Sequence, residues 1–270
     1  MHGRTTLITA SPNKLVHQLL TFILLSLVLC AGLRAQTPEP VSIGSGFLVS
    51  GEGHIVTAYH VIRDKKQLLV GPIEKNRWRI AKLIKVDEAL DLALLQTRID
   101  RPPLAIARWA EVPIGLEALV IGYPQPRLQG LSLKITQGIV NGDRTESGDL
   151  GFFQLSAEVQ KGNSGSPVLA PDGRVIGVVR AKINALTVAE RTGDLAQNVN
   201  YALKSSSLLK FLEDTGVSVR VEELDLELAS RPYQTFRKAA PSVLAIVGRN
   251  PAAKPSAPTD KASGETSIGE

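Results

Sequence analysis

Short apolar runs separated by turn residues dominate the chain between residues 41 and 215. Gly46–Val49 and His54–Thr57 are β-prone runs joined by a glycine-rich turn, a pattern that predicts a hairpin. A second hairpin is predicted where Ser166–Ala170 and Arg174–Val179 flank a Pro-Asp-Gly turn. Many short strands at such close spacing indicate an all-β protein built as a barrel or a sandwich.

The pattern also predicts a few other elements around these hairpins. Leu131–Ile135 and Gly138–Val140 are expected to be strands that precede the second hairpin. A helix is predicted over Ser205–Leu212, with the hydroxyls of Ser205 to Ser207 as caps and Gly216 as a stop. The proline-rich stretch 102–113 is expected to connect two β-domains.

The N-terminus has the pattern of an export signal. Arg4 and Lys14 precede a 13-residue apolar run, Leu19–Ala31, and small residues follow up to Ala35. We therefore expect residues 1–35 to be a signal peptide and the protein to be periplasmic or secreted. The alternative is an uncleaved anchor in the cytoplasmic membrane with the rest of the chain outside, because Leu15–Leu33 carries no charge and approaches the length of about 20 residues needed to cross a bilayer.

Charge and cysteine content exclude several functions. The net charge of +5 falls to near balance once residues 1–35 are set aside, with 28 basic and 26 acidic residues remaining. This balance gives no argument for nucleic acid as a partner. The single cysteine, Cys30, precludes an intramolecular disulfide and a cysteine-rich metal site.

Three segments carry candidate chemistry. His60 lies just beyond the buried run Ile55–Ala58, where an imidazole could act as a base. Asp91 begins the apolar run Leu92–Leu95, where a carboxylate is costly unless it is hydrogen-bonded, and a histidine N–H would satisfy it. Ser164 lies between two glycines on a turn ahead of a strand, where the missing side chains let a substrate carbonyl approach the backbone.

The backbone of the Ser164 turn is a second candidate feature. The N–H groups of Gly162 and Ser164 could both point at one oxyanion. His60, Asp91 and Ser164 also occur along the chain in the order of the chymotrypsin-type triad.

These motifs resemble those of trypsin-like serine proteases, and most of all the bacterial HtrA/DegP group. The resemblance runs from about Val41 to Thr215 and rests on a few segments. They are Gly44-Ser-Gly-Phe47, Thr57-Ala-Tyr-His-Val61, Asp91-Leu-Ala-Leu-Leu95 and Gly162-Asn-Ser-Gly165.

The resemblance implies a fold of two six-stranded antiparallel β-barrels with a C-terminal helix. It also implies that Ser164 is the nucleophile, His60 the base and Asp91 its orienting partner, with Gly162, Asn163 and Ser164 forming the oxyanion hole. Protein or peptide substrates are expected from the resemblance, with no metal and no cofactor.

The chain departs from the group after Thr215. The remaining residues resemble no peptide-binding PDZ domain, so we expect a protease domain over 41–215 and a C-terminal extension over 216–249. Residues 231–247 read as a polar helix followed by a β-like run. Residues 250–270 are rich in Ala, Pro, Ser, Lys and Glu and are expected to be disordered.

Substrate preference stays open between two alternatives. In trypsin-like folds the residue six before the nucleophile lies at the base of the substrate pocket, and here it is Glu158. A carboxylate there favours Arg or Lys, whereas HtrA-like enzymes have a small residue and accept small aliphatic side chains. Asn200 lies in a segment that resembles the one bordering the substrate cleft, although the same segment also reads as a plain core strand.

Two functions are compatible with the sequence. One is an exported serine endopeptidase, and the other is a non-catalytic binding or scaffold protein on a trypsin-like fold. The oligomeric state and the physiological substrate are not encoded in these patterns.

Overall fold

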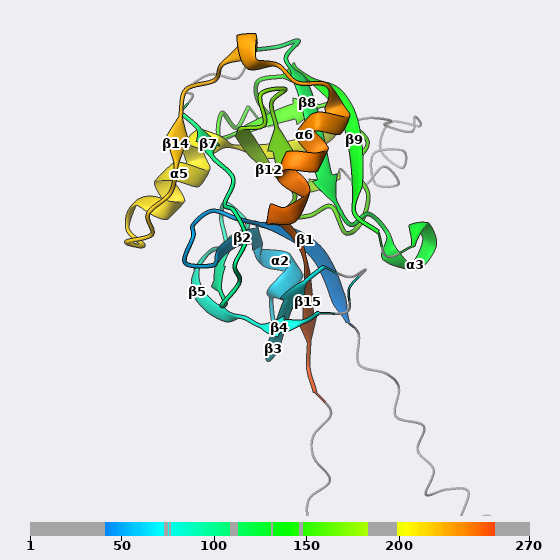
Figure 1. The fold of residues 1–270 in the computed structure, drawn as a ribbon, viewed down its shortest axis with the longest axis vertical. Coiled ribbons are helices and arrows are strands. Elements are labelled where there is room, and N and C mark those ends of the chain that lie inside the picture. The colour runs from blue at the N-terminus through cyan, green and yellow to red at the C-terminus, as the bar shows by residue number, and fades with distance from the viewer. Residues whose placement is uncertain are drawn as a thin grey trace, which may run out of the picture. The chain divides into compact units, whose positions relative to one another are not determined.

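A computed structural model describes residues 41–72, 75, 77–108, 113–130, 132–145, 148–182 and 199–251. All of them belong to one compact unit, in which Figure 1 shows two β-structures and few helices. The predicted signal peptide lies outside the described residues, as does the predicted tail beyond residue 251.

The first sheet forms a barrel from six stretches of chain. Its strand order is β4-β3-β15-β1-β2-β6-β5. Only Ala81 separates β4 from β5, so one bent segment pairs with β3 at one end and with β6 at the other, and the sheet curls round on itself. The strands are β1 (Ser42–Leu48), β2 (His54–Ala58), β3 (Gln67–Gly71), β4 (Arg79–Ile80), β5 (Lys82–Asp87), β6 (Leu92–Gln96) and β15 (Val243–Arg249).

The second sheet closes through a pairing between β11 and β12. Its order is β11-β8-β9-β10-β13-β12, and two short strands, β7 and β14, extend it in parallel beyond β12. The strands are β7 (Ile106–Ala107), β8 (Glu117–Gly122), β9 (Lys134–Gly142), β10 (Phe152–Leu155), β11 (Pro167–Leu169), β12 (Val175–Lys182), β13 (Asn200–Lys204) and β14 (Val221–Glu222). The prediction of two six-stranded antiparallel barrels is confirmed.

The helices of the described residues are short and lie between strands. The α-helices are α2 (Tyr59–Ile62), α3 (Pro126–Gln129), α5 (Ser205–Glu213) and α6 (Pro232–Ala239), and the 3₁₀ turns are η2 (Leu226–Leu228) and η3 (Ala240–Ser242). The predicted C-terminal helix of the fold is α5, which buries Leu208, Phe211 and Leu212 against the core.

Two local predictions are wrong. Ser205 to Ser207 do not cap α5: the N-cap is Lys204 with extended backbone, no side chain caps the helix, and the Ser205 hydroxyl is buried with no partner among the described residues. The two strands expected over 131–140 are one strand, β9, because Thr136 and Gln137 continue the ladder with β8 instead of forming a turn.

The segment predicted as a C-terminal extension contributes strands to both barrels. β14 pairs with β7 in the second sheet, and β15 lies in the middle of the first, between β1 and β3. Figure 1 shows the chain leaving α6 beside the second barrel and entering the first as β15. The sixth strand of the first barrel therefore comes from residues 243–249 and not from 41–215.

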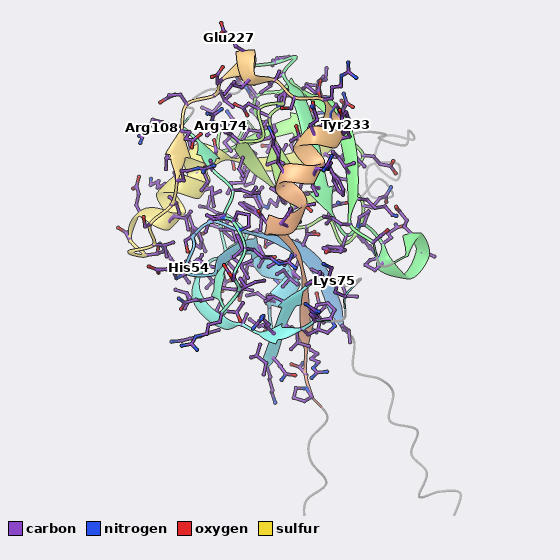
Figure 2. The ribbon with its side chains drawn as sticks, in the orientation of Figure 1. His54, Lys75, Arg108, Arg174, Glu227 and Tyr233 are labelled. Atoms are coloured by element: carbon purple, nitrogen blue, oxygen red, sulfur yellow. The ribbon has the colours of Figure 1, made fainter. Side chains whose placement is uncertain are left out.

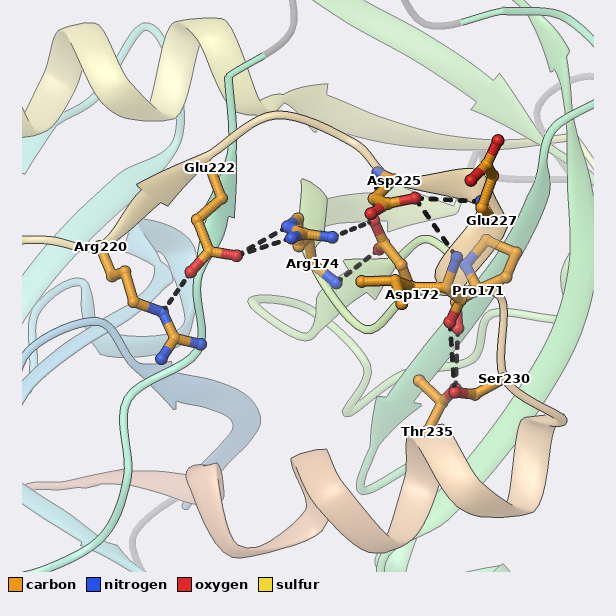
Figure 3. Close-up of polar contacts among 10 residues, drawn as sticks. Pro171, Asp172, Arg174, Arg220, Glu222, Asp225, Glu227, Ser230 and Thr235 are labelled. Atoms are coloured by element: carbon orange, nitrogen blue, oxygen red, sulfur yellow. Dashed lines mark hydrogen bonds and ion pairs between the residues drawn. The ribbon is translucent and has the colours of Figure 1, made fainter.

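A buried carboxylate fixes this segment to the turn between β11 and β12 (Figure 3). The Asp172 side chain has no exposed surface and accepts hydrogen bonds from the backbone and side chain of Arg174 and from the Asp225 N–H. Arg174 also pairs with Glu222 of β14 at 2.8 Å. The neighbouring Pro171 carbonyl accepts from Ser230 N–H and from the Thr235 hydroxyl of α6.

A chain ending at Ser230 is expected to lose cooperative unfolding, whereas a chain ending at Pro251 keeps it. The shorter chain lacks the side chains of Val243, Leu244 and Ile246, which are fully buried. Burial of each contributes about 1.5–3 kcal/mol, against a total stability of about 5–15 kcal/mol for a typical domain. Thermal melts followed by circular dichroism compare the two chains, and a similar sharp transition in both would contradict the role assigned to β15.

A second prediction concerns His54, at the start of β2 in the first barrel (Figure 2). Its Nδ1 lies 2.7 Å from the Ser50 hydroxyl, and burial lowers the pKa of His54 although Glu52 opposes the change. The unfolded chain therefore binds a proton more readily than the folded chain below pH 6.5. The free energy of unfolding should fall as pH decreases from 7 to 5, by less than about 1.4 kcal/mol per pH unit, the limit for one proton.

The measurement is urea unfolding across that pH range for the unaltered chain and for His54→Asn, which cannot take up this proton. His54→Asn should flatten the pH dependence. An equal slope in both proteins would show that another group is responsible.

Candidate active site

His60 is presented at the end of a fully buried strand. β2 ends at Ala58, and α2 begins at once, with Val61 and Ile62 packed into the core. This packing leaves the His60 side chain 39% exposed. The Tyr59 N–H donates to the Asp91 carbonyl at 2.9 Å, which ties the start of the helix to the turn before β6.

Asp91 binds both the backbone and the ring of His60. Its Oδ1 accepts from the His60 N–H at 2.8 Å, and its Oδ2 lies 2.6 Å from His60 Nδ1. Because an ionised carboxylate only accepts hydrogen bonds, the ring donates through Nδ1–H, and Nε2 of the neutral ring is then the basic nitrogen. Asp91 has a φ of +55°, a conformation that L-residues rarely adopt, and its side chain is 12% exposed.

Pairing of β2 with β6 places these two residues together. Ala58 is paired with Leu92, so the residues that follow β2 face those that precede β6. Asp87 stabilises the turn between β5 and β6, because its side chain accepts a hydrogen bond from the Leu90 N–H at 2.9 Å. The histidine and aspartate predicted from the sequence thus form one hydrogen-bonded pair.

Two glycines let the Ser164 loop pack closely, Gly162 against the segment after β8 and Gly165 against the first barrel. Gly162 and Gly165 have φ values of +101° and +82°. A Cβ at Gly162 would lie 2.2 Å from the Tyr123 carbonyl oxygen, and one at Gly165 would lie 2.6 Å from the backbone nitrogen of Ala58. Only glycine fits either position. Since Ala58 is two residues before His60, this close packing brings the partly exposed Ser164 to the same side of the first barrel as His60.

Hydrogen bonds fix the direction of each peptide in this loop. The Lys161 carbonyl accepts from Gln125 N–H at 2.6 Å, and the Asn163 carbonyl accepts from Ser166 N–H at 2.8 Å. In a trans peptide the N–H points away from the carbonyl, so these bonds orient the N–H groups of Gly162 and Ser164. Neither N–H donates to any of the described residues. This pair is the one that the sequence suggested for an oxyanion.

Asn163 shapes the loop from inside. Its side chain is buried and accepts from Gln160 N–H at 3.0 Å, and its own N–H donates to the Gln160 carbonyl at 3.0 Å. The Asn163 N–H is therefore already used within the loop.

The two candidate pocket residues differ in their surroundings. Glu158 is exposed, and its carboxylate accepts from the Gln160 side chain at 2.9 Å. Asn200 is buried at the start of β13 and donates to the Ala157 carbonyl at 2.8 Å, while its Oδ1 has no partner among the described residues. Asn200 thus holds the chain next to Glu158, and the Glu158 carboxylate is solvated.

Sequence reasoning missed three residues that support the loop. They are Ser45 on β1, Tyr123 after β8 and Gln125 before α3. Gln125 adopts φ +37° and ψ +62°, so its conformation is unusual for a residue other than glycine. The only signal for Ser45 was its position between two glycines in the Gly44-Ser-Gly-Phe47 motif.

Within the part of the chain that the structure describes, no three His, Cys, Asp or Glu side chains are grouped to hold a metal ion. No helix among those residues is long and apolar enough to cross a membrane.

Comparison with known proteins identifies relatives of this chain. Residues 44–178 match the family model of the trypsin-like peptidase domain. The chain is 39% identical over 195 residues to an uncharacterized protein, y4bJ, of Sinorhizobium fredii. The aligned region covers 70% of this chain and 31% of that protein. It is 32% identical over 182 residues to the mitochondrial serine protease HTRA2 of Bos taurus, covering 64% and 36%. A probable periplasmic serine endoprotease, DegP-like, from Halomonas elongata is 32% identical over 151 residues, covering 54% and 31%.

Two solved structures share the fold and some sequence. A serine endoprotease from Yersinia pestis matches at 26% identity with a TM-score of 0.53, covering 68% of this chain and 64% of that one. The HtrA-type protease AlgW, solved with a decapeptide, matches at 25% identity with a TM-score of 0.53, covering 64% and 51%. The chain spans about a third of the length of the curated relatives it matches. With a family model that accounts for half of its residues, the chain belongs to the family of trypsin-like peptidase domains.

Proposed function

We propose that this chain is a serine endopeptidase that cleaves protein or peptide substrates through an acyl-enzyme on Ser164. The observation that carries the proposal is the pair of hydrogen bonds that Asp91 accepts from His60, next to a loop whose Gly162 and Ser164 N–H groups are oriented but donate to no described residue. The serine protease relatives support the same chemistry.

The reaction uses three groups of this chain. Ser164 Oγ bonds to the carbonyl carbon of the substrate while His60 Nε2 takes the hydroxyl proton. The negative oxygen of the tetrahedral intermediate accepts hydrogen bonds from the Gly162 and Ser164 N–H groups. The C–N bond then breaks as His60 returns the proton to the leaving amine, and water releases the acyl group by the reverse sequence.

Asp91 has two tasks in this scheme. Its bond to Nδ1 keeps the neutral ring protonated there, so that Nε2 can accept the serine proton. Its bond to the His60 N–H fixes the backbone that carries the ring. The carboxylate also stabilises the imidazolium that forms when the proton has been transferred.

The environment of Glu158 supports a preference for small aliphatic side chains. An exposed carboxylate that is already bonded to Gln160 gains little from pairing with a substrate cation, because water screens the interaction. Val or Ala at the cleavage site is the preference that this arrangement favours over Arg or Lys.

Ser164→Ala and His60→Ala are each expected to lower kcat by about 10⁶-fold and Asp91→Asn by about 10⁴-fold, while the fold persists. The losses should not add when the changes are combined, because the three residues act as a unit. The assay uses fluorogenic peptides with Val, Ala or Arg at the cleavage site, and labelling by a fluorophosphonate reports Ser164 directly. Ser206→Ala is the matched control, since this serine is exposed on α5.

Residual activity of Ser164→Ala near that of the unaltered protein would refute the assignment. A folded protein that neither hydrolyses these peptides nor takes the label would support the alternative of a non-catalytic scaffold.

The proposal includes export from the cytoplasm. It rests on the basic start and apolar run before Ala35 and on the similarity to the probable periplasmic DegP-like endoprotease of Halomonas elongata. In a cell fractionation, the protein should lie outside the cytoplasmic membrane with Gln36 as its first residue. Mass spectrometry that finds intact Met1 in the membrane fraction would establish the uncleaved anchor instead.

A further inference from the structure

We propose that Ser45, a residue of β1 outside the triad, is a positioning residue that fixes the oxyanion loop. The inference rests on the proposed function, because it assigns Ser45 a part in that reaction without contact with the substrate. Its hydroxyl orients the peptide that lies between the two oxyanion donors.

The polar atoms of Ser45 are engaged with the loop and its surroundings. Ser45 is fully buried, and its Oγ donates to the Gly162 carbonyl at 2.7 Å. The same Oγ accepts from Tyr123 N–H at 3.0 Å, so the direction of the hydroxyl proton is fixed toward Gly162. The Ser45 N–H donates to the Ser164 carbonyl at 2.9 Å.

The peptide that receives this hydroxyl connects the two donor peptides. The Gly162 N–H belongs to the peptide before Gly162, and the Ser164 N–H belongs to the peptide after Asn163. The Gly162–Asn163 peptide lies between them, and its carbonyl is the one that Ser45 holds. The relative orientation of the two N–H groups therefore depends on this middle peptide.

Gly162 makes an external restraint necessary. Its φ of +101° lies where glycine rotates without the steric barrier that a Cβ would impose. The Lys161 carbonyl is held by Gln125 on one side, and Ser45 holds the other side. Without the hydroxyl, the Gly162 carbonyl and the Tyr123 N–H both lose the hydrogen bond to Ser45. Because leaving a buried polar group without a partner costs free energy, conformations in which the Gly162–Asn163 peptide rotates toward other partners become more favourable.

The surrounding backbone leaves room for a hydroxyl group here. A Cβ at Gly122 would lie 2.8 Å from Ser45 Oγ and 2.1 Å from Ser166 Oγ. The glycine at the end of β8 thus permits both serine side chains to pack beneath the loop.

The test compares Ser45→Ala with Ser242→Ala in the full chain. Ser242 is also buried and also donates one short hydrogen bond, to the Pro102 carbonyl at 2.6 Å, but it lies just before β15 and not at the loop. Both variants should lower the melting temperature. Only Ser45→Ala should lower kcat, by about 10- to 100-fold, which is less than the 10²–10³-fold lost when an oxyanion donor itself is removed. KM should change by less than about twofold, because the loop acts on the transition state.

Inhibitor affinity supplies the readout that a merely structural role would not move. Ser164 Oγ adds to the carbonyl carbon of a peptide aldehyde, and the resulting hemiacetal places an oxygen where the oxyanion forms. The matching peptide alcohol cannot form this adduct. Ser45→Ala should weaken aldehyde binding by the same factor by which it lowers kcat, and it should leave the affinity for the alcohol unchanged. If Ser45→Ala does not fold, Ser45→Cys keeps the shape of the side chain with a weaker donor and should show the same changes to a smaller degree.

The outcomes separate the two proposals. If the wild type is active and the Ser45 variants have the same kcat and aldehyde affinity as Ser242→Ala, the role of Ser45 is wrong while the proposed function stands. Absence of Ser164-dependent hydrolysis in the wild type would overturn the proposed function and this inference together.

Discussion

The first barrel depends on a strand supplied by the far end of the chain. β15 pairs with β1 from Ser42–Gly248 to Phe47–Val243, and on its other side it pairs with β3. Without it, β1 and β3 would both be open edges with unpaired N–H and carbonyl groups. Closing this barrel therefore requires residues that follow the second barrel in sequence, and the two barrels lie in one compact unit.

The positions of β1 and β2 determine the geometry of the candidate site. The first barrel supplies the His60–Asp91 pair through the pairing of β2 with β6, and the second supplies the Ser164 loop ahead of β11. The separation of the two parts is set by direct backbone packing, because Gly165 lies against Ser45 and Ala58 with no room for a side chain. A change in the position of β1 would move Ser45 and with it the loop that carries Ser164.

The sequence predicted the features that local patterns encode. The two hairpins follow from alternating apolar runs and their turns, and the pairing of His60 with Asp91 follows from the cost of burying a carboxylate without a partner. The partners of β15 could not be predicted, because a β-like run does not specify which distant strand it joins. Ser45 was missed for the same reason: its contact with Gly162 joins residues 117 apart in sequence, and in the motif it reads only as a small residue in a strand. The prediction that Ser205 to Ser207 cap the helix was wrong because the N-cap position is Lys204, whose ammonium group cannot accept a hydrogen bond from the first backbone N–H groups.

The buried anchor at Asp172 connects these observations. A fully buried carboxylate is favourable only when all its partners are present, and one of them is the N–H of Asp225 in the segment that leads to β15. Asp172 lies in the turn at one end of β11, and the Ser164 loop lies at the other end. From the loop, Ser45 continues the connection to β1, which pairs with β15. These contacts therefore link both barrels. β11, which follows the Ser164 loop, is held at one end by the C-terminal segment and at the other end by β1, the strand that pairs with β15 of the same segment.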